Sequence, residues 1–110
     1  MRTRRAWGFY EELMVTKGYR VKRLVFEPGG ELSYQKHFHR AEHWYIAKGF
    51  AFVVLNDNPR YMTAGDSIDI GIQDWHALRN IGSEDVVVIE IQTGDYFDDL
   101  GDIERRPLEI

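Results

Sequence analysis

The segment from Ser33 to Trp44, SYQKHFHRAEHW, concentrates side chains that bind metal ions. It holds three of the four histidines of this 110-residue chain, together with a glutamine and a glutamate. Imidazole nitrogens and carboxylate or amide oxygens are ligands that zinc, iron and manganese accept. The chain contains no cysteine, so disulfide bonds and thiolate metal sites are both excluded. Any metal site in this protein must therefore use nitrogen and oxygen ligands.

A strand through this segment would place several of these groups on one face. Side chains alternate across a strand, so Gln35, His37 and His39 are predicted to share a face, opposite Lys36 and Phe38. Three adjacent polar groups are costly to bury without partners. The shared face must therefore meet either water or a polar ligand. Taken one at a time, these histidines fit a solvent-facing polar strand at least as well as a metal site.

Short strands account for most of the rest of the chain. Runs rich in β-branched and aromatic residues alternate with turn sequences such as EPGGE, LNDNPR, TAGD and NIGSED. We expect strands over residues 19–26, 31–38, 43–49, 50–55, 67–72, 76–80 and 86–92. Only short pieces near each end are candidates for helix. Many short strands at close spacing predict an all-β sandwich or small barrel, whose interior can hold a small ligand.

The size and composition of the chain fit one folded domain. Apolar residues make up 44% of it and aromatic residues 14%, so we expect a single globular domain over residues 1–110. A formal net charge of -4 argues against a general nucleic-acid or anionic-membrane binder, which needs a concentrated basic face. The longest apolar runs are far too short for a membrane span, and no apolar signal region follows the basic N-terminus. We therefore expect a cytoplasmic protein with neither nucleic-acid nor membrane partners.

Two glycine-anchored patterns contain the candidate ligands. The first reads G-x5-Q-x-H-x4-E-x6-G over residues 29–49, and the second reads G-x5-G-x-Q-x2-H-x3-N over residues 65–80. In this order they resemble the two motifs of the cupin superfamily, in which strands of a double-stranded β-helix carry the ligands of one metal. The resemblance implies a single, jelly-roll-like cupin barrel. It also implies that the divalent metal is bound by Gln35, His37, Glu42 and His76.

Departures from the common cupin pattern narrow the resemblance to one family. Glutamine stands where most cupins have their first histidine, and Gly71 and Gln73 replace the usual proline and glycine of the second motif. The stretches RAWGFYEEL, GYRVKRLVFEPGGELSYQKHFHRAEHW, AGDSIDI and EIQTGDYFDDLGDIERR resemble the cupin domain of type II phosphomannose isomerases, which often forms the C-terminal part of mannose-1-phosphate guanylyltransferases. This resemblance covers about residues 4–106. It implies metal-dependent interconversion of mannose 6-phosphate and fructose 6-phosphate, with zinc as the expected metal and manganese, iron or nickel as alternatives.

Such an isomerase needs a group that transfers a proton between C2 and C1 of the sugar, while the metal stabilises the enediolate between them. His39 and His43 are the candidates beside the implied metal ligands, and Lys22 is a third. A second ligand register would keep more imidazoles but break the glycine spacing. That register consists of His37, His39, His43 and His76.

The candidate substrate contacts are cationic and aromatic side chains. Arg40 and Arg79 carry guanidinium groups that fit phosphate oxygens, and Lys22 and Arg23 are further phosphate candidates. Each of these charges would also be ordinary on a solvated surface. Trp75 could stack on a sugar ring because it precedes His76, although large aromatic side chains more often lie in a core.

Other functions remain open on the sequence alone. Ala77 follows His76 where family members commonly carry a basic residue, and the chain ends without the extended tail that often follows in the family. The alternative to an isomerase is a metal-dependent module that binds a sugar phosphate or nucleotide sugar without turnover and serves a separate guanylyltransferase. A third hypothesis is a cupin enzyme, such as an iron dioxygenase, that acts on another small substrate. Strand edges that need covering favour a homodimer.

Overall fold

The computed structural model of the chain describes residues 1–98 and 101–108, in which every regular element is a β-strand. The strands are β1 (Arg2–Arg5), β2 (Gly8–Thr16), β3 (Tyr19–Phe26), β4 (Glu31–Lys36), β5 (Arg40–Lys48), β6 (Phe50–Leu55), β7 (Asn58–Thr63), β8 (Ser67–Ile70), β9 (His76–Asn80), β10 (Val86–Gly94) and β11 (Glu104–Arg105). No helix of the described chain is long and apolar enough to cross a membrane.

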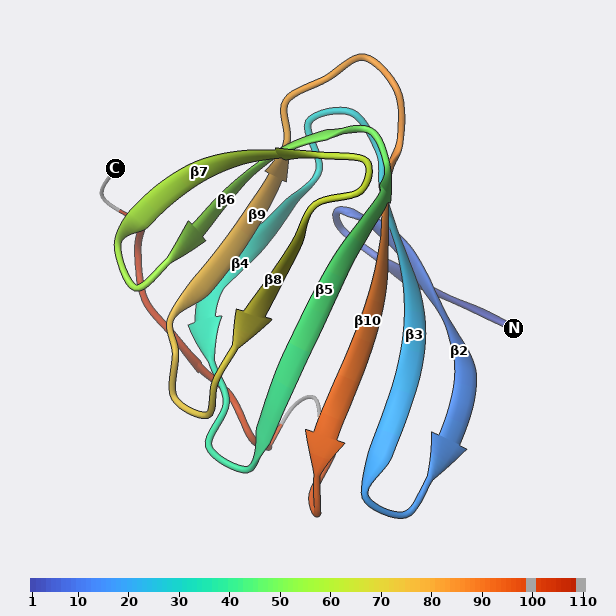
Figure 1. Cartoon of the computed structure of the whole chain (residues 1–110), viewed down its shortest axis with the longest axis vertical. Coiled ribbons are helices and arrows are strands. Elements are labelled where there is room, and N and C mark those ends of the chain that lie inside the picture. The colour runs from blue at the N-terminus through green and yellow to red at the C-terminus, as the bar shows by residue number, and fades with distance from the viewer. Residues whose placement is uncertain (99–100, 109–110) are drawn as a thin grey trace.

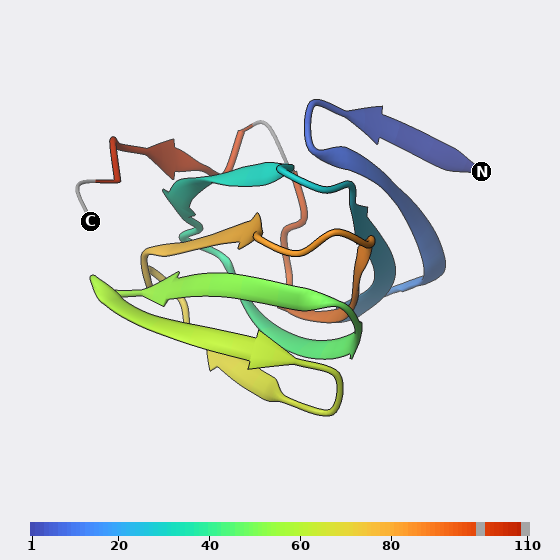
Figure 2. The same ribbon diagram turned by 90° about the horizontal axis from the view of Figure 1, so that it is seen from above.

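The strands form two antiparallel sheets that face each other (Figures 1 and 2). One sheet has the order β1-β2-β3-β10-β5-β8, and the other has the order β11-β4-β9-β6-β7. The all-β, jelly-roll-like architecture is therefore confirmed. Over the described residues the ladders stay within each sheet, so the architecture is an open sandwich and does not close into a hydrogen-bonded barrel.

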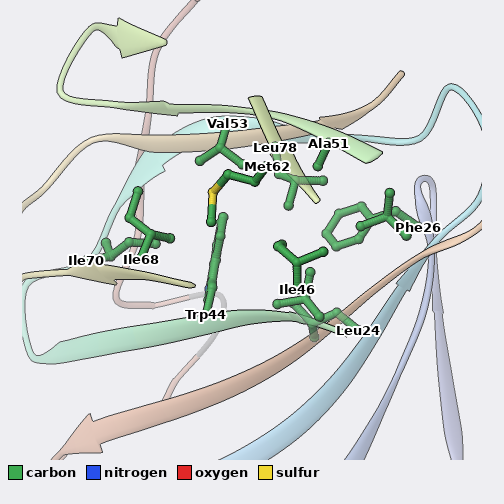
Figure 3. Close-up of a cluster of buried hydrophobic side chains, with 12 residues drawn as sticks. Leu24, Phe26, Trp44, Ile46, Ala51, Val53, Met62, Ile68, Ile70 and Leu78 are labelled. Atoms are coloured by element: carbon green, nitrogen blue, oxygen red, sulfur yellow. The ribbon is translucent and has the colours of Figure 1, made fainter. Parts of the chain in front are cut away.

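Inward side chains of both sheets build one large apolar cluster. It consists of Leu24, Phe26, Trp44, Ile46, Ala51, Val53, Met62, Ile68, Ile70, Leu78, Val86 and Val88. Figure 3 shows Trp44 at the centre of this cluster, with Ile70 on one side and Ile46 on the other. Trp44 is only 1% exposed, and burial of so large an aromatic surface is a main source of stability in a domain of this size.

The predicted strands are present. Strands 19–26, 50–55 and 76–80 are confirmed with unchanged bounds as β3, β6 and β9. The other predicted strands, which correspond to β4, β5, β8 and β10, are present with shifted ends. The most consequential shift is in β4, which ends at Lys36 and leaves His37 and His39 in the connection to β5.

The short helices expected near each end are wrong within the described residues. Near the N-terminus, residues Gly8–Thr16 form β2, which pairs with β3 from end to end apart from an irregularity between Glu12 and Met14. Glutamate, leucine and methionine in this segment favour a helix on their own, but pairing in a hairpin overrides such propensities. Strand β7 was not predicted, because its start lies in the turn-like segment LNDNPR. Asn56 and Asp57 have φ angles of 48° and 66°, so the turn takes only these two residues and β7 follows at once.

Substitution of Gly49 and of Gly65 by alanine tests why glycine occupies these two motif positions. Both have left-handed φ angles, +95° and +97°, at which a side chain costs roughly 1–2 kcal/mol. A Cβ atom on Gly49 would also lie 2.6 Å from the carbonyl oxygen of Asp85 and 2.8 Å from Cα of Val86, whereas Gly65 faces open space.

We therefore expect Gly49→Ala to lower the free energy of unfolding by about 3 kcal/mol or more, and Gly65→Ala by only about 1–2 kcal/mol. Urea denaturation of the two variants beside the parent protein measures both values. Equal losses would contradict a steric requirement for glycine at position 49.

Candidate metal centre

Three buried side chains meet between the two sheets. The sheets contribute Glu42 from β5 and His76 from the start of β9, and His37 comes from the turn after β4. One ligand atom from each of the three lies within 4.8 Å of the others. The two Glu42 oxygens are each 3.6 Å from one imidazole nitrogen, Nε2 of His37 or Nε2 of His76. The two glycine-anchored motifs are thus brought together at one point.

Backbone carbonyls determine the tautomer of both histidines. Nδ1 of His37 is 2.7 Å from the carbonyl oxygen of Asp102, and Nδ1 of His76 is 2.8 Å from that of Asp74. Because a carbonyl oxygen only accepts hydrogen bonds, each Nδ1 carries the hydrogen and each Nε2 keeps its lone pair. Burial lowers the pKa of both histidines to about 4. Both imidazoles are therefore neutral at neutral pH, as metal ligands must be.

The protein leaves one atom of the centre, Nε2 of His76, without a partner. Among the described residues it is the one buried side-chain nitrogen or oxygen without a hydrogen-bond partner. Such an atom costs about 1–3 kcal/mol if it stays unsatisfied. A divalent cation between the two imidazoles and Glu42 would satisfy it, and two neutral imidazoles with one carboxylate are a donor set that fits zinc, manganese or iron.

Gln35 and Arg40 border this donor set. Gln35 faces His76 in the register of β4 and β9, and its Oε1 accepts a hydrogen bond from Ser33. Arg40 is 5% exposed, and it donates from Nη2 to Nε2 of His37 at 3.1 Å and from Nε to Glu42 at 3.0 Å. A metal bound through the same lone pair of His37 requires the Arg40 guanidinium to move away from that nitrogen.

A cavity of about 300 Å³ leads from these residues to the surface. Its inner wall includes His37, Glu42 and Arg40, and its outer part includes Arg5 of β1 and Arg105 of β11. Figure 2 shows that β1 and β11 lie along the same side of the molecule. The volume is at the lower end of the range for small-molecule sites. The cavity is therefore of a size for a small polar molecule.

A buried polar network extends the inner wall. Glu90 accepts hydrogen bonds from Nε1 of Trp44 at 2.9 Å and from Nε2 of Gln92 at 2.7 Å, and Gln92 accepts one from Arg20 at 2.8 Å. Burial, reinforced by the Glu42 carboxylate, raises the pKa of Glu90 to about 7. Glu90 faces the cavity opposite Lys22 in the register of β3 and β10. This carboxyl group can therefore hold or release a proton near neutral pH.

The structure brings together the four residues of the first predicted ligand set. It does not bring together those of the second set. Gln35, His37, Glu42 and His76 all lie at the centre described above. The side chain of His39 is 58% exposed and bonds to Asp102, because the strand alternation that would turn it inward ends at Lys36.

His43 also departs from its predicted place. It alternates with Glu42 on β5, so it lies on the outer face of the sheet, where its side chain is 40% exposed and bonds to Asp69 at 2.6 Å. The prediction that His43 transfers a proton at the metal is therefore corrected. The register that needs both His39 and His43 as ligands is corrected for the same reason.

Some of the predicted substrate contacts lie in the cavity and others lie outside it. Arg40 and Lys22 line the cavity. Arg79 points outward from β9 and pairs with Glu31 at 2.9 Å. Trp75 packs beside Tyr34, away from the cavity, between the charged ends of two other side chains. These positions correct the predictions for Arg79 and Trp75.

Several cavity residues were not predicted. Glu90 and Gln92 had a usable signal, since the alternation in VVVIEIQ places both on the face that also carries buried valines. Arg5 and Arg105 of the cavity had none, and neither had Asp102, which lies beside His37, because only the folded topology brings these distant parts of the chain to the same side of the molecule.

Substitution of His76 by glutamine tests the centre while roughly preserving side-chain volume. The change removes an imidazole lone pair that has no other partner, so we expect the affinity for zinc to fall by at least about tenfold and the urea midpoint to change little. The matched control is His43→Gln on the outer face, which should bind zinc as the parent does. Metal content after equilibration with limiting zinc measures the effect, and a full metal complement in the His76 variant would exclude this residue from the site.

Comparison with known proteins places the chain among sugar-metabolic proteins. The family described as mannose-6-phosphate isomerase, C-terminal, matches residues 1–107. The alginate biosynthesis protein AlgA of Pseudomonas putida is 40% identical over 101 residues, which are 92% of this chain and 21% of that protein. The mannose-1-phosphate guanylyltransferase ManC of Salmonella typhimurium is 37% identical over 95 residues, which are 86% of this chain and 20% of ManC. The chain thus spans about a fifth of these relatives.

Solved structures support the fold at low sequence identity. The capsular polysaccharide assembling protein CapF of Staphylococcus aureus superimposes with a TM-score of 0.84 at 18% identity, over 98% of this chain and 34% of CapF. A cupin domain of Cnp3 from Schizosaccharomyces pombe superimposes with a TM-score of 0.73 at 18% identity, over 79% of this chain and 64% of that one. With the two motifs, the fold and the family match in agreement, the chain belongs to the mannose-6-phosphate isomerase C-terminal family of cupin domains.

Proposed function

We propose that this domain is a metal-dependent isomerase that interconverts mannose 6-phosphate and fructose 6-phosphate. The observation that carries the proposal is the pair of neutral imidazole lone pairs beside Glu42, at the inner end of a cavity with cationic side chains at its outer end. Membership of the family supports the choice of substrate. A cytoplasmic location is part of the same proposal.

Four residues of the centre would hold the metal on which the proposed reaction depends. A divalent cation, with zinc expected and manganese, iron or nickel as alternatives, would be held by His37, Glu42 and His76, with Gln35 as a further ligand. When bound, it would supply Lewis-acid stabilisation of negative charge on the substrate oxygens at C1 and C2. Arg40, which would leave His37 but can keep its contact with Glu42, would add a positive charge on the same side of the cavity.

Glu90 is the proposed proton-transfer group. Its raised pKa of about 7 allows it to take a proton from C2 of the sugar and return it to C1 at neutral pH. It lines the cavity, whereas the side chain of His39 is exposed and that of His43 lies on the outer face. Lys22 lines the cavity beside Glu90 and remains a second candidate.

The outer end of the cavity is the proposed phosphate site. Arg105 donates to the Ser33 hydroxyl at 3.2 Å, and Arg5 lines the same cavity from β1. Guanidinium groups fit phosphate oxygens, and a phosphate held there would point the other end of the sugar toward His37 and Glu42. Neither arginine takes part in the metal centre, so phosphate binding and metal binding can be tested separately.

The alternative of a binding module without turnover loses one of its arguments. It was favoured by Ala77, which stands where family members commonly have a basic residue. Ala77 is buried with Tyr34 and Val54 on the face of the sheet away from the cavity. A basic residue at this position would therefore not point into the proposed active site.

Isomerase activity can be measured with zinc-loaded protein and mannose 6-phosphate in deuterated water. We expect fructose 6-phosphate to form and the recovered sugars to contain solvent deuterium. Chelation and His37→Ala should both abolish the reaction. Arg105→Ala should raise KM by roughly tenfold or more with a smaller effect on kcat, and Arg79→Ala on the outer face should leave both unchanged. If neither ketose nor deuterium appears although the sugar phosphate binds, the binding-module hypothesis is the better account.

We also propose that the domain forms a homodimer through the edge of β2. Within the described residues β1 covers β2 only over Gly8–Glu11. On the uncovered part, Leu13, Met14 and Val15 are 54%, 51% and 65% exposed. Uncovered apolar edge strands favour pairing with another chain, and antiparallel pairing of β2 with its own copy would bury these side chains in a two-fold interface.

The substitution Val15→Lys tests this edge. A charge there opposes burial against a second copy, so we expect the variant to be monomeric by light scattering at protein concentrations where the parent is dimeric. Ile72→Lys is the matched control, because Ile72 is 54% exposed in the turn before β9 and lies on no strand edge. A parent protein that is monomeric, or a Val15 variant that stays dimeric, would contradict the proposed interface.

A further inference from the structure

We infer that Asp102 is a positioning residue of the metal centre, because its contacts hold the turn between β4 and β5 with His37 turned inward and His39 turned outward. The inference rests on the metal site proposed above. Asp102 lies outside both glycine-anchored motifs. It is far along the chain from the turn that it contacts. Its side chain is only 1% exposed.

The contacts of Asp102 involve three consecutive residues of the turn. One carboxylate oxygen, Oδ1, accepts hydrogen bonds from the backbone N–H of Phe38 and from the ring of His39, both at 2.9 Å. The other, Oδ2, accepts one from the backbone N–H of His39 at 3.0 Å. The backbone carbonyl oxygen of Asp102 accepts one from Nδ1 of His37 at 2.7 Å. The residue therefore determines both the path of the turn and the tautomer of a metal ligand.

The turn needs such a partner because the sheet no longer supports it. Strand β4 ends at Lys36 and β5 begins at Arg40, so residues 37–39 lie outside both strands. A regular strand through this point would place His37 and His39 on one face. In the structure the side chain of His37 is 2% exposed and that of His39 is 58% exposed. The ring of His39 points to Asp102, which keeps it from competing for the metal.

Burial of the carboxylate argues that this arrangement is specified by the sequence. A buried carboxylate is costly unless hydrogen-bond donors surround it. Asp102 has three donors from the turn, and its own backbone N–H donates to the carbonyl oxygen of Asp98 at 3.1 Å. Loss of the carboxylate would leave the N–H groups of Phe38 and His39 without their acceptor. We therefore expect the turn to relax and the imidazole of His37 to lose its fixed orientation.

The first measurement needs no metal. Long-range proton–nitrogen correlation spectra distinguish the two neutral tautomers of a histidine ring, and a His37→Gln variant assigns the signal. In the metal-free parent we expect His37 to carry its hydrogen on Nδ1. In Asp102→Ala we expect a mixture of tautomers or the Nε2–H form. This readout would not move if Asp102 only attached the C-terminal segment to the rest of the fold.

The second measurement is zinc affinity by competition with a chromophoric chelator. We expect Asp102→Ala to weaken binding by about 10–100-fold, the range found when a group that orients a metal ligand is removed. Asp102→Asn keeps one carbonyl acceptor and should have a smaller effect. The matched control is Asp69→Ala, which removes the partner of an exposed histidine on the outer face and should leave zinc affinity unchanged.

The two readouts separate this inference from the proposed function. If the parent protein binds none of zinc, manganese, iron and nickel, the proposed function fails, and the tautomer of His37 still decides the role of Asp102. A folded Asp102→Ala protein with the parental tautomer and parental zinc affinity would overturn the inference. Should Asp102→Ala not fold, the same measurements on Asp102→Asn decide it, with an unchanged tautomer and affinity again counting against the role.

Discussion

The interior of this domain is organised around a buried carboxylate that faces two imidazole lone pairs. Glu42 is 4% exposed and has one histidine nitrogen near each of its oxygens. Three electron-rich groups at such short range are unfavourable without a cation among them. Arg40 provides positive charge on one side of the cluster, and Nε2 of His76 remains without any protein partner. A cation would complete this cluster, whose negative charge Arg40 only partly neutralises.

Trp44 connects the polar centre with the apolar core. The ring of Trp44 packs in the large apolar cluster, and its Nε1 donates to Glu90. The rings of Trp44 and His76 make a T-shaped contact with their centroids 5.5 Å apart. The core thereby fixes the position of one metal ligand and of the proposed proton-transfer group at once. A rigid support of this kind is what a site needs if small displacements of catalytic groups are costly.

Sequence spacing predicted that the four proposed ligands would come together, because they lie on or directly beside regular strands of known alternation. The same alternation placed Lys22 in the cavity and would have placed Glu90 there. It failed for His39, because β4 ends before the turn. His43 was a candidate only because it follows Glu42 in the sequence, and the alternation along β5 in fact turns it to the outer face. The roles of Arg105 and Asp102 could not be predicted, since they depend on long-range contacts that no local pattern encodes. The helix expected near Glu11 was wrong because hairpin pairing outweighs local propensity.

The position of Asp102 along the chain has a consequence for biosynthesis. A separation of 65 residues lies between this acceptor and the imidazole of His37, and chains emerge from the ribosome with the N-terminal part first. Both strands beside the turn are synthesised long before Asp102 is available to fix it. Selective capture of a metal would then have to await the synthesis of Asp102, and a chain that has not yet reached this residue would offer the cell's metal ions only loosely arranged histidines.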